Sequence, residues 1–134
     1  MIEINNLTDF SLDEEFLKKT AEKVLKEENV EDFRLSVAFI ENEEMRKINK
    51  QYLKKDYPTD VLSFLEESDF GEIVICPQEV KKNTEKIDGV FKKELCRVLI
   101  HGVLHLLGYD HEKSVKDANM MDKKEKQYLK NIFN

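Results

Sequence analysis

The histidines of this chain lie in one short stretch, and their spacing is that of a metal site. All 3 histidines of the 134 residues fall within the run His-Gly-Val-Leu-His-Leu-Leu-Gly-Tyr-Asp-His, at positions 101, 105 and 111. On a helix, His101 and His105 share one face and lie about one turn apart. Gly108 stands where a glycine can end the helix in the left-handed conformation, so that the chain turns back and brings His111 close.

The number and type of these side chains indicate which metal they would bind. Three neutral imidazoles leave a fourth position for water, which is the arrangement of a catalytic rather than a closed structural zinc site. We therefore expect one Zn²⁺ per chain, bound by His101, His105 and His111, with other divalent transition metals as alternatives. Hydrogen-bonded core histidines without a metal are the other explanation. The completeness of the motif, with no histidine elsewhere, favours the metal.

The same spacing occurs in metzincin peptidases, and one position separates this chain from them. Those enzymes carry a glutamate directly after the first histidine, where it acts as the general base. This chain has Gly102 at that position. Peptide hydrolysis is therefore disfavoured, and a metalloprotease is only the third of three possible functions.

The helix that carries the first two histidines is predicted to span residues 90–107. Turning its positions by about 100° per residue puts apolar side chains on most of the circumference. Glu94, Arg97 and His105 fall within roughly 40° of His101, so the helix has one narrow polar stripe. Arg97 is therefore a candidate for positive charge beside the metal.

The composition is that of a globular chain without a membrane segment. It is 40% hydrophobic and 37% charged, and we expect a single domain over residues 1–134. No apolar run approaches the ~20 residues that span a membrane, and the first residues lack the pattern of a signal peptide. We expect a cytoplasmic protein.

Charge is distributed unevenly along the chain. Residues 1–45 contain 13 acidic and 5 basic side chains, and residues 46–134 contain 15 acidic and 17 basic. The half that carries the histidines is therefore the basic half. Such asymmetry is compatible with nucleic acid docking on one face, although a solvated surface of mixed charge explains it equally well.

Hydrophobic periodicity predicts four strands and five helices. The strands are expected at residues 2–4, 33–40, 61–65 and 72–76, and the helices at residues 12–28, 43–52, 77–86, 90–107 and 115–132. The third strand is apolar throughout, so it is expected in the centre of the sheet, antiparallel to the fourth. Ser11 is expected to cap the first helix and Asn42 the second, whose inner face would carry Met45, Ile48 and Tyr52.

Three stretches together form a recognisable pattern: the histidine run at 101–111, Lys-Asp-Tyr-Pro-Thr-Asp-Val-Leu-Ser-Phe at 55–64, and Gly-Glu-Ile-Val-Ile at 71–75. In these stretches the chain resembles the bacterial YbeY family, described as metal-dependent endoribonucleases of ribosomal RNA maturation. The resemblance implies that His101, His105 and His111 are zinc ligands and that the substrate is RNA. It also implies an α+β fold of mixed layers, in which a mixed sheet of about four strands is packed by about five helices and the histidine helix lies in the core beside a cleft.

Further candidate site residues come from the loop at 53–60 and from the histidine run. Lys55, Lys54 and Arg97 are candidates for contact with a phosphate, with a solvated loop cation as the alternative for each lysine. Asp110 is expected either to hold the imidazole of the neighbouring His111 or to cap the turn. Thr59, Asp60 and Ser63 are expected to form the turn from loop to strand, with lining of the cleft as the alternative.

Two positions depart from the family pattern. Family members commonly have an arginine after the tyrosine that corresponds to Tyr52, whereas this chain has Leu53, and Leu65 stands where a proline often follows Ser-Phe. The missing guanidinium removes a planar phosphate clamp, and Lys54 or Lys55 can replace its charge but not its two-pronged geometry.

Three classes of function follow. The first is a zinc-dependent endoribonuclease that acts on single-stranded regions of ribosomal RNA precursors, in rRNA maturation and ribosome quality control, with the small ribosomal subunit as partner. The second is a non-catalytic RNA-binding factor of ribosome assembly with a structural zinc, which Leu53 and the acidic N-terminal third favour. The third is the metalloprotease. Neither DNA nor a membrane is expected as a partner.

Overall fold

The chain forms a four-stranded mixed sheet with helices on both of its faces. The computed structural model describes residues 1–86, 89–110 and 112–133. Within these residues the strands are β1 (Ile2–Asn6), β2 (Arg34–Phe39), β3 (Val61–Glu67) and β4 (Phe70–Ile75), and the helices are α1 (Glu14–Glu27), α2 (Asn42–Leu53), α3 (Pro77–Lys86), α4 (Phe91–Leu106) and α5 (Val115–Phe133). The strand order is β1-β2-β4-β3, in which β1, β2 and β4 are parallel and β3 is antiparallel to β4. The predicted α+β class with a mixed sheet is confirmed.

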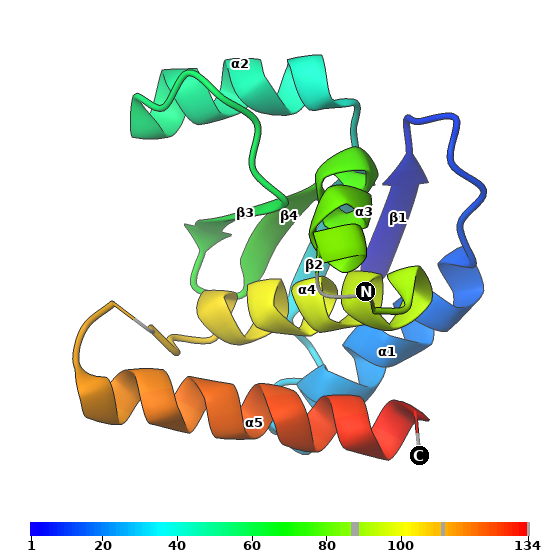
Figure 1. Cartoon of the computed structure of the whole chain (residues 1–134). Coiled ribbons are helices and arrows are strands. Elements are labelled where there is room, and N and C mark those ends of the chain that lie inside the picture. The colour runs from blue at the N-terminus through cyan, green and yellow to red at the C-terminus, as the bar shows by residue number, and fades with distance from the viewer. Residues whose placement is uncertain (87–88, 111, 134) are drawn as a thin grey trace.

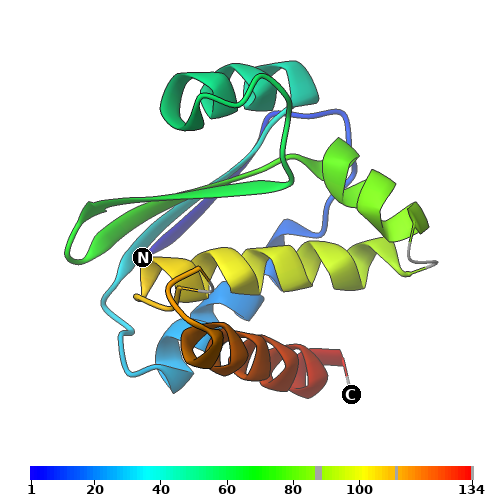
Figure 2. The ribbon, with the colours of Figure 1, turned by 60° about the vertical axis from the view of Figure 1, so that its left-hand side comes forward.

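The helices lie in layers on either side of the sheet (Figure 1). One face is covered by α2, the opposite face by α4 and α1, and α5 packs on the side of α4 that is turned away from the sheet. Figure 2 shows the same layers after a turn of 60°, with the β3–β4 turn reaching out at one end of the sheet. No helix within the described residues is both long enough and apolar enough to cross a membrane.

The inner strands β2 and β4 alternate between fully buried residues on one face and mostly partly buried residues on the other. Leu35, Val37 and Phe39 of β2 belong to the main core, on the side of α1 and α4. On the other face, Ala38 of β2 and Val74 of β4 pack against the smaller cluster that contains Met45 of α2. The sheet therefore lies between α2 on one face and α1 and α4 on the other.

Close approach of α4 to the sheet depends on two glycines. A Cβ atom on Gly71 of β4 would lie 2.7 Å from Leu106 Cδ1 of α4, which is too close for two carbon atoms. Gly102 of α4 faces the sheet in return, and its carbonyl oxygen accepts a hydrogen bond from Ser63 Oγ of β3 at 3.2 Å. These contacts fix one face of α4 against β3 and β4. The polar stripe of the helix then lies between the edge strand β3 and helix α5.

Several local predictions are confirmed. Helix α3 spans residues 77–86 as predicted, with Pro77 in its first turn. Strands β3 and β4 pair antiparallel. Gly108 has a φ of +103° and so adopts the left-handed conformation predicted for the end of the histidine helix.

The prediction that the third strand is central is wrong, because β3 is an edge strand. Its apolar sequence has a different cause. Leu62 is buried beneath α2, and Val61 packs against the main core on the other side. An edge strand that lies between two helical layers needs apolar side chains on both faces, just as a central strand does.

The predicted helix caps are also wrong. Helix α1 begins at Glu14 and is capped by Asp13, whose Oδ1 accepts a hydrogen bond from Phe16 N at 3.1 Å, whereas Ser11 lies outside the helix. Asn42 is the first residue of α2 rather than its cap. Its backbone N–H donates to Gln78 Oε1 of α3 at 3.1 Å, so a distant side chain satisfies a donor that a local cap would otherwise satisfy.

The inner face of α2 differs from the prediction at one position. Met45 is buried and Ile48 is half-buried as expected, but Tyr52 is 60% exposed. Asn49 is the buried residue of the second turn instead. Periodicity assigns the inner face by hydrophobicity, and it cannot identify an asparagine that is buried because its amide binds a loop.

Candidate active site

His101 and His105 line one cleft. Its volume is about 470 Å³. Helix α4 forms one wall, residues 53–60 between α2 and β3 form the opposite wall, and β3 lines the space between them. The lining residues are Asn49, Leu53, Lys55, Tyr57, Thr59, Asp60, Val61, Leu62, Ser63, Phe64, His101, His105 and Glu112. The cleft therefore joins the two helical histidines to the second stretch on which the family resemblance is based.

A side chain of α5, Glu125, holds the ring of His101. Its Nδ1 lies 2.9 Å from Oε1 of Glu125, a residue that is only 8% exposed. A carboxylate accepts hydrogen bonds, so this contact places the proton on Nδ1 and leaves the lone pair of the neutral ring on Nε2. Histidines that bind metals are usually oriented in this way by a carboxylate on the other ring nitrogen.

Arg97 lies on the other side of the same carboxylate. Its Nη1 is 3.4 Å from Glu125 Oε1, and its Nη2 is 2.6 Å from Glu94 Oε1. Burial lowers the pKa of Arg97, but the hydrogen bond to Glu94 and the charges of Glu125 and Glu94 outweigh burial and raise the pKa above its ordinary value. Arg97 is thus beside His101, as the helical stripe predicted, and its guanidinium is bound to two carboxylates.

Glu125 was not predicted as a site residue, although the sequence contains a signal. In α5 the buried residues are Met121, Glu125 and Tyr128, at helical spacing. A glutamate in the apolar stripe of an amphipathic helix must have a partner, since a buried charge without one is costly. The sequence does not reveal which partner it has.

Lys55 reaches the cleft from the opposite wall. Its side chain is exposed and lines the cleft, and Lys54 before it has a φ of 61° where it ends α2. The loop is held from inside by Asn49, which is 1% exposed. Asn49 Nδ2 donates to Tyr57 O at 2.8 Å, and Asn49 O accepts from Lys55 N at 3.3 Å. One buried residue therefore fixes the backbone on both sides of Asp56.

The residues expected to form the turn into β3 contribute to the cleft wall. Thr59, Asp60 and Ser63 all line the cleft. Thr59 Oγ1 donates to Asp60 Oδ1 at 3.4 Å, whereas Ser63 Oγ bonds to α4. Of the two predictions for these residues, lining of the cleft therefore describes their position better than a role in the turn alone.

Asp110 lies in the turn after α4, next to the cleft residue Glu112. Its Oδ1 accepts a hydrogen bond from Glu112 N at 2.9 Å, which is the turn-capping contact named as one of its two expected roles. It lines a separate cavity that also contains Glu28 and Tyr109. His111, the third predicted ligand, lies outside the described residues, so the expected pairing of Asp110 with its imidazole does as well.

The turn after α4 is anchored by Glu28, at the end of α1. Glu28 accepts hydrogen bonds from Tyr109 and Tyr128 and from Lys124 Nζ. Burial raises the pKa of Glu28, but these three donors together lower it below its ordinary value. Burial and the hydrogen bond to Glu28 raise the pKa of Tyr109 to about 12. The segment that leads to His111 is thus tied to α1 and α5.

Imidazoles suit a divalent transition metal, and two of the three predicted ligands lie within the described residues. His101 and His105 border one cleft, and the buried Glu125 orients the first of them. Across residues 1–86, 89–110 and 112–133, no group of three or more His, Cys, Asp or Glu side chains is arranged to hold a metal ion. Two imidazoles from these ranges would need a third ligand, and the sequence predicts His111 for that role.

At Gly102, where metzincin peptidases carry their glutamate, this fold leaves little space for a side chain. A Cβ atom on Gly102 would lie 3.1 Å from Ile73 Cδ1 and 3.2 Å from Ser63 Oγ. The residue thus faces the sheet rather than the cleft. A glutamate here could not act as a general base on a substrate.

Gly102→Glu is expected to lower the free energy of unfolding by about 3 kcal/mol or more, because it places an unpaired carboxylate against the sheet. Urea denaturation measures the change. Lys93→Glu on the exposed side of α4 is the control and should change stability by less than about 0.5 kcal/mol. A stable Gly102→Glu variant that hydrolyses casein would contradict this account.

Comparison with known proteins agrees with the geometry. The family model described as Endoribonuclease YbeY matches residues 3–133. The Endoribonuclease YbeY of Thermotoga maritima is 40% identical over 121 residues, covering 89% of this chain and 80% of the relative. That of Persephonella marina is 38% identical over 134 residues, covering 94% and 88%.

A solved structure shows the same fold. The solution structure of a Thermotoga maritima protein superposes with a TM-score of 0.75 at 37% identity, covering 99% of this chain and 89% of that one. The fold and these matches define a class of hydrolases described as endoribonucleases. This chain belongs to the YbeY family, as the resemblance predicted.

Proposed function

We propose that this protein is a metal-dependent endoribonuclease that hydrolyses phosphodiester bonds of ribosomal RNA precursors in the cleft between α4 and residues 53–60. The observation that carries the proposal is the contact between His101 Nδ1 and the buried Glu125 on a histidine that lines the cleft. The relatives named Endoribonuclease YbeY support the substrate class.

The proposal assigns one Zn²⁺ per chain to His101, His105 and His111. When bound, such a metal supplies Lewis-acid stabilisation of charge on a phosphate and a water whose pKa is lowered toward neutrality. Glu125 keeps the proton on Nδ1 of His101 and so presents Nε2 as a ligand. Asp110 accepts the hydrogen bond from Glu112 N in the turn after α4.

The remaining cations have separate roles in this proposal. Lys55 contacts a phosphate of the substrate from the wall opposite the histidines. Arg97 acts through Glu125 rather than on the phosphate, because two carboxylates already hold its guanidinium. We further propose that the protein acts on single-stranded regions and works at the small ribosomal subunit in rRNA maturation and quality control.

A second function remains, a ribosome-assembly factor that binds RNA without cutting it and whose zinc is structural. The observation that favours it is Leu53, which lines the cleft where family members commonly have an arginine. Without that guanidinium, a phosphate in the cleft has one planar donor group fewer.

Incubation with RNA and with casein, each with and without a chelator, separates these functions. The endoribonuclease should cut RNA that contains unpaired segments, lose the activity with chelator and regain it when zinc is restored, and leave casein intact. Metal-independent RNA binding without cleavage would favour the assembly factor. Cleavage that survives the chelator would contradict the metal assignment.

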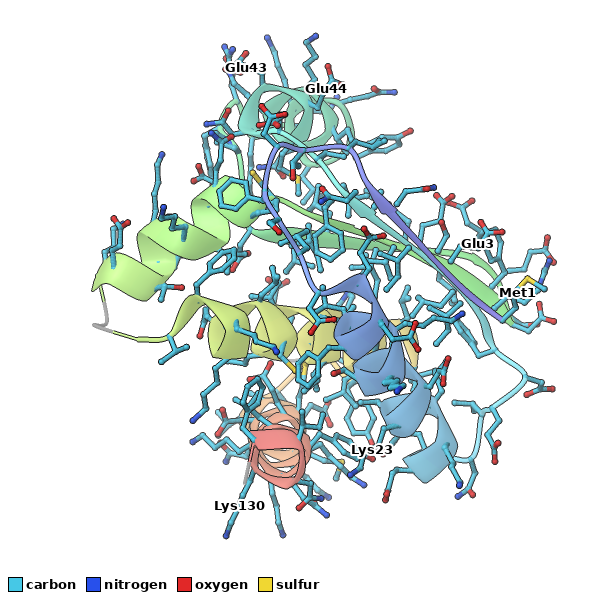
Figure 3. The ribbon with its side chains drawn as sticks, turned by 90° about the vertical axis from the view of Figure 1, so that its right-hand side faces the viewer. Met1, Glu3, Lys23, Glu43, Glu44 and Lys130 are labelled. Carbon is cyan, nitrogen blue, oxygen red and sulfur yellow. The ribbon has the colours of Figure 1, made fainter. Side chains whose placement is uncertain are left out.

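Lys55→Ala is expected to weaken binding of unrelated RNA sequences alike and to reduce the salt dependence of log K by ~0.7 to 0.9, the contribution of one phosphate contact. Titrations at several salt concentrations measure the slope. Lys130→Ala is the matched control, since Figure 3 shows Lys130 on α5, at the side of the molecule opposite α2. An equal slope for Lys55→Ala and the unchanged protein would remove Lys55 from the binding site.

A further inference from the structure

We propose that the cleft wall formed by Leu53, Tyr57 and Phe64, called here the aromatic wall, binds one unpaired RNA base by stacking on Tyr57. The inference rests on the proposed endoribonuclease function and deepens it, because it names the part of the substrate that this wall takes. It concerns a different wall from the one that carries the histidines.

The aromatic wall is apolar and open to solvent. Tyr57 is 54% exposed and Leu53 is 49% exposed, although both line the cleft. Phe64 extends this apolar surface, and the ring of Tyr52 packs on the ring of Phe64 with the centroids 5.2 Å apart. Large apolar side chains that are exposed together commonly mark a binding surface, and here they border the cleft that contains His101.

The backbone beneath Tyr57 is fixed before any ligand arrives. Its carbonyl oxygen accepts the hydrogen bond from the buried Asn49, and Pro58 restricts the preceding residue to extended conformations. A tyrosine also has only two side-chain torsions to order on binding. The ring is therefore presented at small entropic cost, which favours a stacking platform over a side chain that is exposed by chance.

The other residues that line the cleft indicate which ligand binds to the aromatic wall. Lys55, two residues before Tyr57, lines it too, and the histidines lie on the opposite wall. A nucleotide carries a flat base and a negative phosphate close together, so a ring and a lysine on one wall complement both parts. In a duplex each base is covered by its neighbours on both faces. Only an unpaired base can therefore stack on Tyr57.

The test is a binding titration with metal-free protein, so that no RNA is cut. The probes are a short single-stranded RNA and a duplex of the same sequence. Tyr57→Ala should raise the Kd for the single strand by about five- to 150-fold. Tyr57→Leu, which keeps an apolar side chain but has no ring, should behave like Tyr57→Ala. Tyr57→Phe should stay within about threefold of the unchanged protein because the ring remains.

Two further measurements distinguish stacking from a general loss of binding. Kd for the duplex, with both ends closed by loops, should be the same for all Tyr57 variants, since its paired region offers phosphates but no free base face. An RNA in which 2-aminopurine replaces one base at a time should show fluorescence quenching at one position, kept in Tyr57→Phe and lost in Tyr57→Ala. Leu7→Ala, at an exposed leucine outside the cleft, is the control and should bind like the unchanged protein.

Each other outcome has a definite meaning. Equal binding of single-stranded RNA by Tyr57→Ala and the unchanged protein overturns the inference, while RNA cleavage that needs metal would still support the proposed function. Equal losses for single strand and duplex overturn it as well. A dimer that dissociates in Tyr57→Ala overturns it in favour of contact between two copies of the chain. Absence of any RNA binding by the unchanged protein overturns the proposed function itself.

Discussion

His105→Ala is expected to lower the rate of RNA cleavage by at least about a hundredfold while changing RNA affinity by less than about threefold. Removal of one ligand from a three-histidine site weakens metal binding and takes away the metal's share of catalysis. Docking depends instead on phosphate contacts from lysine, which the substitution does not touch. His105 is exposed in the last turn of α4, so the fold should tolerate alanine there.

Elemental analysis and single-turnover cleavage check this prediction together. The unchanged protein should contain about one equivalent of metal, and His105→Ala should contain less. Lys93→Ala, at an exposed residue of the same helix, should leave both values unchanged. Full cleavage by His105→Ala with its metal absent would show that the reaction does not use this site.

Glu125→Gln is expected to weaken metal binding by about 10- to 100-fold. The carboxylate at 2.9 Å fixes the proton on His101 Nδ1, whereas a glutamine amide offers a donor as well as an acceptor and no longer favours one tautomer. The loss of charge also makes His101 a weaker ligand. Competition with a chromophoric chelator measures the affinity directly.

A matched variant separates orientation of His101 from simple packing of α5. Glu94→Gln removes the other carboxylate that holds Arg97 and leaves Glu125 at His101 in place, so metal affinity should change by less than about threefold. The thermal stability of both variants, measured without metal, reports packing alone. Equal losses of affinity in the two variants would assign the effect to Arg97, and an unchanged affinity in Glu125→Gln would remove Glu125 from the site.

Local patterns predicted the secondary structure well because each element depends on its own side chains. Helix α3 and the antiparallel pairing of β3 with β4 follow from periodicity and a proline. The edge position of β3 does not, because strand order depends on how whole layers pack. Likewise, the backbone N–H of Asn42 at the start of α2 donates to Gln78 of another helix. No local sequence pattern contains that information.

The same division holds for the candidate site. Spacing along one helix was sufficient to place Arg97 beside His101 and both histidines on one side of α4. Glu125 is 24 residues further along the chain than His101, and only the packing of α5 on α4 brings its carboxylate to the ring. Asn49 is similar, because its burial is explained by a loop carbonyl rather than by hydrophobicity. Sequence reasoning thus identified the candidate residues that share one helix and missed residues that act between elements.

The contacts made by α5 have a consequence for synthesis of the chain. Glu125 orients His101, and Tyr128 helps to hold Glu28, which also binds Tyr109 in the turn before His111. Segments that are 81 and 100 residues apart in the sequence must therefore meet before that turn is fixed. A nascent polypeptide therefore cannot complete these contacts, or the proposed site that they support, until α5 is free to pack on α4.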